Sequence, residues 1–371
     1  MTDAEPVSAG SRGFMAGDFW RDRRVMLTGH TGFKGSWLAL WLQALGANVT
    51  GFSSCVPTQP SLFELARVGA GMDSIEGDVR DPRALSAAFA AVRPEIVIHM
   101  AAQSLVRRSF VEPRLTYEVN VIGTVNLLEA VRLDGDVRVV INVTSDKCYE
   151  NHEWEWPYRE GDPMGGHDPY SSSKGCAELV TNAFRRSFFC ADDAPRVASA
   201  RAGNVIGGGD WGEDRLLPDL MRAALGRRSA RVRNPCSVRP WQHVLNPLSG
   251  YLTLARALWS SERLTGGWNF GPAEGDARPV AWVVRRIAAS WPEQLRWSEE
   301  VGSPGSAPHE AQCLKLDSSR ARTHLGWRPL WALEQGLDET VAWYRALLAG
   351  EDMSAVTAGQ IASYAQTIVM S

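Results

Sequence analysis

Several features that define other classes of protein are missing from this sequence. Its six cysteines are scattered without a CxxC pair, so neither a disulfide nor a zinc framework is expected and the thiols should be reduced. No apolar run approaches the ~20 residues that span a bilayer, and residues 1–17 lack the apolar segment of a signal peptide. A net charge of -3 with mixed signs gives no electrostatic reason to bind nucleic acid. We therefore expect a soluble, cytoplasmic protein whose partners include neither nucleic acid nor a membrane.

The histidines show no metal-binding pattern either. His99, His167, His243 and His309 are not spaced as metal ligands, so we expect no metal site and hydrogen-bonded structural roles instead. The 371 residues are enough for a large core and for two domains or one elaborated domain. Internal repeats and low-complexity tracts are also absent from the sequence.

Short β-branched apolar runs alternate with helical segments over the first two hundred residues. Strands are expected at 24–28, 48–52, 95–99, 139–143 and 196–201, and helices at 36–45, 82–92, 114–133 and 169–189. Such alternation predicts an α/β fold with a parallel, doubly wound sheet. After Ala202 the chain is loop-like, and helical patterns return at 247–260, 279–290 and 333–348. We interpret this part as a smaller, mainly helical lobe that closes over the carboxyl edge of the sheet.

Three glycines follow the first predicted strand and open the first predicted helix. The pattern Gly29-x-x-Gly32-x-x-Gly35 permits a tight turn and close backbone approach to a pyrophosphate, whose charge the helix N-terminus would stabilise. We predict an NAD(P)-binding loop here, and a purely structural turn is the alternative. The loop residues assigned to the cofactor are Gly29, Thr31, Gly32, Phe33, Lys34 and Gly35.

The choice between NAD and NADP depends on residues farther along the sheet. The second strand ends in Phe52-Ser53-Ser54, without the acidic residue that usually binds the adenosine ribose. Lys34 could meet a 2′-phosphate or could be a solvated charge, and the latter is favoured slightly. Asp78 could bond the adenine or only cap the next helix. The expected cofactor is NAD, and NADP is not excluded.

Titratable residues gather where the strand at 139–143 ends. Tyr170 and Lys174 are four residues apart at the start of a predicted helix and so share one face. A lysine beside a tyrosine stabilises the phenolate, so the pKa of Tyr170 is expected to fall below its usual ~10, which would make Tyr170 a base at neutral pH. Asp146 and Lys147 add a second acid and base. Two such pairs in one site indicate more than a simple oxidation.

Arginines are frequent in the loops of the second lobe. Arg215, Arg231, Arg233 and Arg239 lie near one another in sequence, and guanidinium groups bind phosphate oxygens with two hydrogen bonds. Together with Asn204 they predict a diphosphate-binding lobe. An ordinary surface cluster is the alternative.

Several stretches of the chain carry a family resemblance. They are Thr28-Gly-His-Thr-Gly-Phe-Lys-Gly-Ser-Trp37, Pro57-Thr-x-Pro-Ser-Leu-Phe-Glu64, His99-Met-Ala-Ala-Gln-Ser-Leu-Val-Arg-Arg108, Thr144-Ser-Asp-Lys-Cys-Tyr149, Gly165-Gly-His-Asp-Pro-Tyr-Ser-Ser-Ser-Lys174, Ala200-Arg-Ala-Gly-Asn-Val-Ile-Gly-Gly-Gly-Asp-Trp211, Arg233-Asn-Pro235 and Arg239-Pro-Trp-Gln-His-Val244. From about residue 18 to 347 the chain resembles the nucleotide-sugar 4,6-dehydratases, which are extended short-chain dehydrogenases/reductases of Rossmann-type fold. Lysine rather than glutamate at position 147 is typical of the branch that acts on CDP-glucose.

The resemblance implies a reaction in three steps. Tyr170, assisted by Lys174, would take the proton of the sugar 4-hydroxyl during oxidation at C4, while Ser145 would bond the developing ketone. Asp146 would then act as the acid toward the 6-hydroxyl and Lys147 as the base at C5, before a hydride returns to C6. An unshifted lysine is protonated at pH 7, which weakens the base role of Lys147.

The same resemblance extends the expected sites and sets the domain limits. Additional cofactor contacts are expected from Asp78, Val79, Ala101 and Ala102, and substrate contacts from Gln103, Arg108, Asn204, Arg215, Arg233, Arg239 and His309. We expect a disordered or extended leader over 1–19, an NAD(P)-binding domain over 20–203 to which 240–264 returns, a nucleotide-sugar lobe over 204–239 and 265–350, and a C-terminal tail over 351–371.

Two hypotheses compete with the dehydratase. A nucleotide-sugar 4-epimerase or plain dehydrogenase would need Tyr170 and Lys174 but neither Asp146 nor Lys147. A non-catalytic NAD(P)-sensing scaffold would be expected to have lost the tyrosine or lysine, and both are present. The helices expected at 114–133 and 169–189 carry apolar faces that pair in relatives, which predicts a homodimer or homotetramer; packing on the sheet is the alternative.

Overall fold

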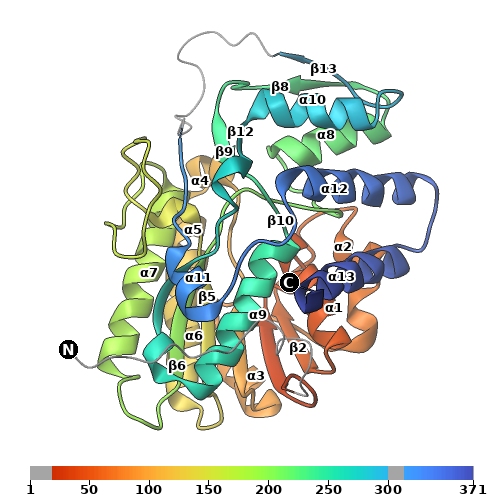
Figure 1. The fold of residues 1–371 in the computed structure, drawn as a ribbon. Helices are drawn as coiled ribbons and strands as arrows, with labels where there is room; N and C mark the ends of the chain where they lie inside the picture. The colour runs from red at the N-terminus through yellow and green to blue at the C-terminus, as the bar shows by residue number, and fades with distance from the viewer. Residues whose placement is uncertain (1–18, 300–312, 371) are drawn as a thin grey trace.

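A seven-stranded parallel sheet forms the centre of the molecule (Figure 1). A computed structural model describes residues 19–299 and 313–370, so the expected leader at 1–19 lies outside the described residues apart from Phe19. The strand order is β3-β2-β1-β4-β5-β6-β11, which is the order of a Rossmann-type doubly wound sheet and confirms the predicted fold class. The strands are β1 (Arg24–Thr28), β2 (Asn48–Ser53), β3 (Asp73–Glu76), β4 (Ile96–His99), β5 (Val139–Val143), β6 (Arg196–Arg201) and β11 (Gly266–Asn269).

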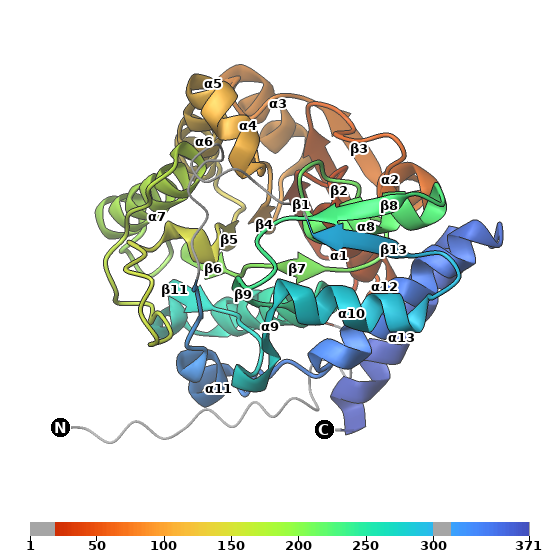
Figure 2. The same cartoon turned by 90° about the horizontal axis from the view of Figure 1, so that it is seen from above.

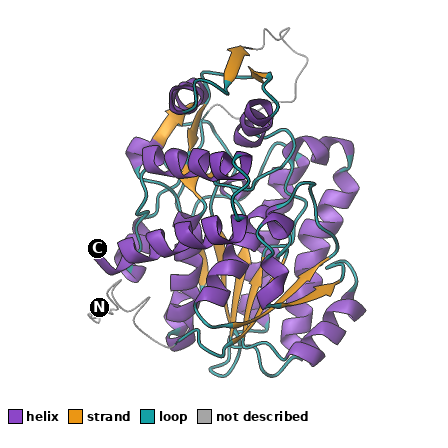
Figure 3. Cartoon of the chain, turned by 90° about the vertical axis from the view of Figure 1, so that its right-hand side faces the viewer, coloured by secondary structure: helices purple, strands orange, loops and turns teal. Residues whose placement is uncertain are grey.

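Helices cover both faces of this sheet (Figure 3). On one face lie α1 (Phe33–Ala44) and α9 (Leu245–Ser260), and on the other α3 (Pro82–Val92), α6 (Gly123–Leu133) and α7 (Pro169–Ser187). The strands feed both layers because successive side chains alternate in direction. In β5, Val139 and Ile141 pack with the α1/α9 layer, whereas Val140 packs with the α3/α6 layer. Each of these side chains is fully buried, so truncating Ile141 to alanine would cost about 2–5 kcal/mol.

Local signals explain where the main helices begin and end. Asp81 caps α3 by accepting from the amides of Arg83 and Ala84, Pro82 occupies its first turn, and Arg93 ends it in a left-handed conformation. The helix expected at 114–133 is divided into α5 (Pro113–Tyr117), a π-helical turn η3 (Glu118–Ile122) and α6. Within the π turn, the Asn120 amide bonds the backbone of the Gln103 loop instead of solvent.

A second lobe stands over the carboxyl edge of the sheet (Figure 2). The helices α8, α10 and α12 contribute to it together with three two-stranded sheets, so short strands accompany the helices of this mainly helical lobe. Its elements are β7 (Val205–Ile206), α8 (Leu216–Leu225), β8 (Ser229–Val232), β9 (Val238–Pro240), β10 (Gln242–His243), β12 (Ala277–Pro279), α10 (Val280–Ser290), β13 (Arg296–Glu299) and α12 (Leu333–Leu348). The remaining short elements are α2 (Leu62–Leu65), η2 (Val68–Gly71), α4 (Val106–Val111), η4 (Asp146–Cys148), η5 (Glu262–Leu264), η6 (Glu274–Asp276) and α11 (Ser319–Leu325).

The segment that returns to the sheet is longer than the predicted range 240–264. Helix α9 packs on β5 and β6, and β11 then pairs with β6 in parallel from Gly266 to Asn269. This strand lies inside the range expected for the sugar lobe, because a four-residue strand with two glycines gives a weak strand pattern.

Residues 353–370, expected as part of a tail, form helix α13 (Met353–Met370) against α1. Tyr364 is fully buried there, and its ring meets the edge of Trp41 at 5.6 Å. Its hydroxyl donates to Asn246 Oδ1 at 2.9 Å, and the same oxygen accepts from the amides of Leu330 and Trp331. Asn246 therefore ties α9 to the C-terminal segments.

The described part of the chain contains neither a candidate membrane span nor a candidate metal cluster. None of its helices combines the length and the apolar character of a membrane span. Within the same residues, no three His, Cys, Asp or Glu side chains are grouped as they would be around a metal ion. All six cysteines are free thiols.

Candidate active site

The carboxyl ends of the central parallel strands meet at one edge of the sheet. There β1 ends at Thr28, β4 at His99 and β5 at Val143. Strands β1 and β4 are neighbours although their chain connections leave in opposite directions, so this is the switch point at which doubly wound sheets bind ligands. The predicted cofactor and catalytic motifs both follow these strand ends.

The glycine loop is built for a close approach to a dinucleotide. Gly29 has a φ of +76°, and a Cβ there would lie 2.7 Å from the amide nitrogen of Ala101; one on Gly35 would lie 2.1 Å from the Gly29 oxygen. A Cβ on Gly32 would meet only the Gly29 oxygen, at 3.4 Å. Gly32 is the N-cap of α1 and brings no side chain to its first amides. These amides at an uncapped helix N-terminus fit an anionic pyrophosphate.

The other expected cofactor residues lie along the same edge. The Thr28 hydroxyl accepts from the amides of Met100 and Ala101, which holds Ala101 and Ala102 beside the glycine loop. The Asp78 carboxylate is bound by Arg80 at 2.6 Å, so its pKa is lowered mainly by this hydrogen bond. Val79 is buried in the α3/α6 layer.

His30 of the glycine loop contacts Ser53 at the end of β2 and Ser74 in β3. Its Nε2 is 2.7 Å from Ser74 Oγ and its Nδ1 is 2.9 Å from Ser53 Oγ. A Cβ on Gly51 would lie 2.3 Å from the His30 ring, so the glycine makes room for it. Burial lowers the pKa of His30 to about 4, and the imidazole is therefore neutral at pH 7. The sequence signal for these contacts is a histidine in the glycine loop together with a glycine in β2. It becomes evident only once the pairing of β1 and β2 is known.

Lys34 is half-buried rather than a fully solvated charge, which was the favoured expectation, and its contact lies on α9 rather than at the β2 end of the sheet. Its ammonium group donates to the hydroxyl of Tyr251 at 3.3 Å. Tyr251 belongs to α9 and is fully buried. The charges of Asp146, Lys174 and Arg215 act on the ammonium group of Lys34, so the side chain lies within electrostatic reach of the catalytic residues.

Ser145 and Asp146 form the first turn after β5. Ser145 caps η4 by accepting from the amide of Lys147, and its hydroxyl donates to Asp146 Oδ1 at 2.9 Å. Asp146 is 2% exposed, and burial raises the pKa of its carboxyl although Lys147, Ser145 and Lys34 oppose the shift. A raised pKa favours the protonated form, which is the form that a general acid needs.

The loop after β6 encloses the Asp146 carboxylate. A Cβ on Gly203 would lie 1.7 Å from Asp146 Oδ2, so only glycine leaves space for the acid. Asn204 follows in a left-handed conformation with a φ of +47°, and its amide lies 3.5 Å from the same oxygen. The predicted substrate residue Asn204 thus contacts a predicted catalytic residue.

Tyr170 and Lys174 lie on consecutive turns at the start of α7, as the spacing predicted. Asp168 caps the helix, and the Tyr170 amide donates to Ser109 Oγ of α4 at 3.2 Å. Burial raises the pKa of Tyr170 to about 12, with hydrogen bonding to Ser145 acting in the opposite direction. Burial also lowers the pKa of Lys174 to about 8. The expectation of a lowered tyrosine pKa was wrong, because burial of the hydroxyl outweighs the hydrogen bond with Ser145 and the charge of Arg215.

The expected substrate residues are only partly brought together. The charges of Arg215 and Arg239 act on catalytic residues, Arg215 on Tyr170 and Arg239 on Asp146. Arg233 binds Asp214 at 3.3 Å, and Arg108 is an exposed residue paired with Glu112, the residue that follows α4. The Gln103 side chain forms hydrogen bonds with the Thr116 hydroxyl and with the backbone of Leu105. His309 lies outside the described residues.

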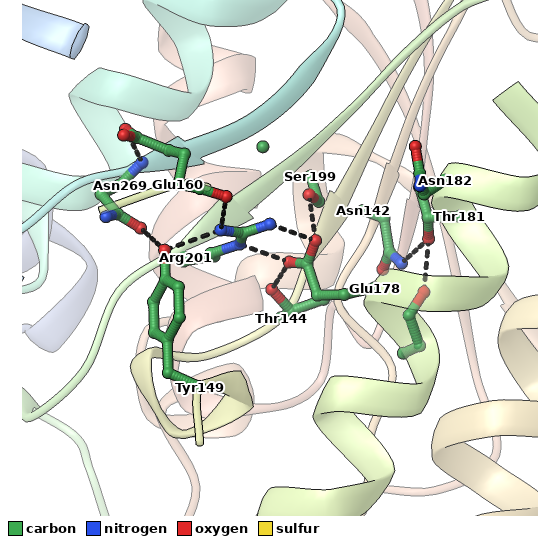
Figure 4. A network of polar contacts seen from close by, with 12 residues as sticks. Asn142, Thr144, Tyr149, Glu160, Glu178, Thr181, Asn182, Ser199, Arg201 and Asn269 are labelled. Atoms are coloured by element: carbon green, nitrogen blue, oxygen red, sulfur yellow. Dashed lines mark hydrogen bonds and ion pairs between the residues drawn. The ribbon is translucent and has the colours of Figure 1, made fainter. Parts of the chain in front are cut away.

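A buried polar network includes residues on both sides of the catalytic turn, Thr144 before it and Tyr149 after it (Figure 4). Glu178 and Arg201 form a two-pronged ion pair at 2.9 and 2.7 Å, and both side chains are 5% exposed. Thr144, which precedes the catalytic turn, donates to Glu178 Oε1 at 2.5 Å. Arg201 also donates to the Tyr149 hydroxyl at 2.6 Å. The network therefore fixes both ends of the segment that carries Ser145 and Asp146.

The sequence contains a signal for this network. Tyr170, Lys174 and Glu178 follow one another at intervals of four and so share one face of α7. A charged residue that continues a buried face needs a partner of opposite charge. Arg201 at the end of the apolar strand β6 is that partner.

Replacing Glu178 with glutamine is expected to lower the free energy of unfolding by about 3–5 kcal/mol, because Arg201 would remain buried without its counter-charge. Burial alone would raise the pKa of Glu178, but Arg201, Ser199 and Thr144 outweigh it and lower the pKa. The contribution of Glu178 to stability is thus complete above its unfolded pKa of about 4.3. It is lost as the pH falls through the lower pKa of the folded state.

Urea unfolding at several pH values measures this effect. The matched control is Glu129→Gln, which breaks an exposed pair with Arg132 and should change stability by less than about 1 kcal/mol. Equal losses in the two variants would contradict the structural role of Glu178.

Known proteins resemble this chain in sequence and in fold. The family model described as GDP-mannose 4,6 dehydratase matches residues 26–247. The chain is similar to the CDP-glucose 4,6-dehydratase of Salmonella typhimurium, with 50% identity over 352 residues that cover 94% of this chain and 97% of the relative.

Solved structures share the fold at lower identity. An epimerase, Mth375 of Methanothermobacter thermautotrophicus, matches with a TM-score of 0.78 and 21% identity over 92% of this chain and 97% of that one. The dTDP-glucose 4,6-dehydratase of Bacillus anthracis, solved in complex with NAD, matches with a TM-score of 0.70 and 21% identity. The match covers 87% of this chain and 96% of that one. At these identities the likeness concerns the fold alone.

Proposed function

Since this chain belongs to the GDP-mannose 4,6 dehydratase family, we propose that it removes water from CDP-glucose to give CDP-4-keto-6-deoxyglucose. The observation that carries the proposal is the buried Asp146 beside Tyr170 and Lys174, since oxidation alone needs no additional acid. The 50% identity to a CDP-glucose 4,6-dehydratase across 94% of the chain supports the choice of substrate.

Oxidation at C4 is assigned to Tyr170. Its hydroxyl oxygen would take the proton of the sugar 4-hydroxyl, and the resulting ketone oxygen would be bonded by Ser145. Lys174 lies one helical turn away and is charged below its pKa of about 8, which favours the phenolate. NAD, when bound at the glycine loop, would supply the chemistry of accepting a hydride from C4 and returning it to C6.

Elimination is assigned to Asp146 and Lys147. The 4-ketone acidifies the C5 proton, which Lys147 or a water that it positions would remove. The Asp146 carboxyl would give its proton to the departing 6-hydroxyl, so that water leaves from C5–C6. The raised pKa of Asp146 supports the acid role, since it keeps the proton available at higher pH.

NAD rather than NADP is the proposed cofactor. The β2 end of the sheet presents neutral His30 with Ser53 and Ser74, whereas Lys34 reaches Tyr251 of α9 instead. A 2′-phosphate would therefore gain no charge-assisted hydrogen bond from these residues. A nucleotide-sugar diphosphate would be bound in the second lobe near Asn204, Arg215 and Arg239.

A substrate panel tests the proposal. The protein would be incubated with CDP-, dTDP-, GDP- and UDP-glucose, each with NAD and with NADP, and mass spectrometry would report the loss of one water. We expect water loss with CDP-glucose and NAD. Interconversion of the 4-epimers without a change of mass would favour the epimerase, and no reaction with any sugar would overturn the enzymatic proposal.

A homo-oligomer is also proposed, through the outer face of α5–α7. Exposed apolar side chains gather on these helices: Tyr117, Ile122, Leu133, Leu179 and Phe188. Such a face is typical of an interface between protein chains. A monomeric mass in gel filtration at micromolar concentration would contradict it.

A further inference from the structure

A second hollow in the protein surface lies away from the active site. It has a volume of about 610 Å³ and is formed by the end of α7, the loop from α7 to β6 and the segment before β11, and we call it the α7–β6 cavity. These elements meet at the edge of the sheet opposite the second lobe (Figure 1). Tyr170 and Arg185 lie on the same helix, roughly 20 Å apart along its axis, so the cavity is separate from the catalytic residues. Its volume is within the roughly 300–1,000 Å³ of small-molecule sites.

Positive charge gathers at this cavity. Arg185, Arg186 and Arg196 line it. A Cβ on Gly266 would lie 2.5 Å from Arg185 Nη1 and 3.6 Å from Arg320 Nη1, so a fourth arginine stands beside the lining. Gly266 has a φ of +110°, and the absence of a side chain leaves room for both guanidinium groups. The fold therefore brings arginines from α7, β6 and α11 to one place.

Most N–H groups of the lining arginines have no acceptor in the described part of the chain. A guanidinium group carries five such donors. Arg185 donates to the Asn182 side chain, and one nitrogen of Arg196 donates to the carbonyls of Leu258 and Trp259. Within the described residues, none of the three lining arginines forms an ion pair with a carboxylate. The other donors are available to a ligand.

Support of the helix end does not account for Arg185. Arginines in the last turn of a helix often bond its last carbonyl groups. Here the backbone amides of Phe188 and Phe189 donate to the Phe184 carbonyl. Arg185 bonds the side chain of Asn182 instead. The end of α7 is therefore closed without this guanidinium group.

The rest of the lining has an acidic and an apolar part. Asp192 and Glu262 are exposed, whereas Arg185 and Arg196 are half-buried. Solvent and salt screen exposed charges more than partly buried ones, so the interior of the cavity favours an anion. Apolar side chains complete the lining, at Phe189, Ala191, Ala194 and Pro195. A ligand with both an anionic and an apolar part fits this combination.

We propose that the α7–β6 cavity is a second binding site, which holds a nucleoside diphosphate. Guanidinium groups bind phosphate oxygens with two parallel hydrogen bonds, and two linked phosphate groups can engage more than one of Arg185, Arg186 and Arg196. The ribose and base would lie against the apolar part of the lining. Inorganic phosphate alone would leave most of the cavity empty. Binding here involves no chemical step and does not depend on the proposed function of the active site.

The thiol of Cys190 reports directly on this site, because Cys190 is exposed and lines the cavity. The full-length protein would be alkylated with iodoacetamide in the presence of CDP, ADP, pyrophosphate or cytidine, and peptide mass spectrometry would follow each cysteine. CDP and ADP should slow the alkylation of Cys190 at lower concentrations than pyrophosphate, and cytidine should have no effect. Cys236, which is exposed in the second lobe, reports in the same digest on binding elsewhere.

Two replacements should weaken the protection by different means. Arg185→Gln deletes a charged donor, so about tenfold more CDP should be needed to protect Cys190. Ala191→Glu adds a carboxylate to the lining without touching an arginine, and should act in the same direction. Ala191 is exposed, so this variant should fold normally even if Arg185→Gln does not. Arg93→Gln, which breaks an exposed pair with Asp136 outside the cavity, is the matched control and should keep the wild-type protection.

The results separate the alternatives. Unchanged alkylation of Cys190 with both nucleotides, or protection that persists in both Arg185→Gln and Ala191→Glu, would overturn the site. Protection by pyrophosphate at the same concentration as by CDP, or protection by cytidine, would overturn the assignment to a nucleoside diphosphate. Loss of water from CDP-glucose takes place at the opposite edge of the sheet, so the proposed function can fail while Cys190 is protected, and the reverse.

Discussion

Asp146→Asn should reduce the rate of water loss by about 10²- to 10⁴-fold, the range that general acid catalysis contributes, while oxidation at C4 continues. Asparagine keeps the shape of the side chain and can still accept from Ser145, so the pocket should retain its geometry. It has no proton of suitable acidity to give to the 6-hydroxyl. The reaction should therefore stop after its first step.

Rapid mixing with one equivalent of CDP-glucose would show this result. The near-ultraviolet absorbance of the reduced nicotinamide should rise and persist in Asp146→Asn, whereas in the wild type it should rise and decay. Asp136→Asn, which removes a carboxylate bound to Arg93 away from the site, is the control and should behave like the wild type. Normal water loss in Asp146→Asn would exclude Asp146 as the acid.

The second large effect is expected from Tyr170→Phe, which should abolish the first step as well as those that follow. A phenyl ring fills the same buried space but cannot take the proton of the 4-hydroxyl, so oxidation should slow by about 10²- to 10⁴-fold. Since a base must be deprotonated to act and burial holds the pKa of Tyr170 at about 12, the wild-type oxidation rate should rise as the pH increases from 6 to 9.

The absorbance of the reduced nicotinamide separates the two variants. It should stay flat in Tyr170→Phe, in contrast to its persistent rise in Asp146→Asn. Tyr117→Phe, at a partly exposed position on α5, is the matched control. Rapid formation of the reduced nicotinamide in Tyr170→Phe would show that another group takes the proton.

Five of the seven strands of the central sheet, all except β3 and β11, were predicted from the sequence, for physical reasons. Strands β5 and β6 and helix α3 have the predicted limits, because short β-branched runs are buried on both faces and Asp81-Pro82 marks a helix start. The glycine loop and the Tyr170–Lys174 spacing depend on neighbouring residues, and local sequence is sufficient to predict them.

Other elements depend on partners that are distant in the chain. The two glycines of β11 form a strand only because β6 offers an open edge, and the π turn at Glu118–Ile122 exists where Asn120 bonds the Gln103 loop. The expected helix at 114–133 was therefore interrupted. Helix α13 is stabilised by its packing against α1, which no local pattern reveals.

The direction of a side chain is equally hard to predict. The place of Lys34 in the glycine loop was evident, but its contact spans 217 positions to Tyr251. The rise of the Tyr170 pKa likewise follows from burial, which depends on Ser109 and the lobe above it rather than on the lysine one turn away.

The pairing of β11 with β6 has a consequence for synthesis of the chain on the ribosome. At roughly 5–20 residues per second, Asn269 emerges about 3 to 14 s after Arg201, with which it pairs. During that interval β6 is an unpaired edge of a nearly finished sheet, and such edges bind other strands readily. We therefore expect aggregation to threaten the nascent protein most between these two points, and a slow stretch of codons before residue 266 would lengthen the exposure.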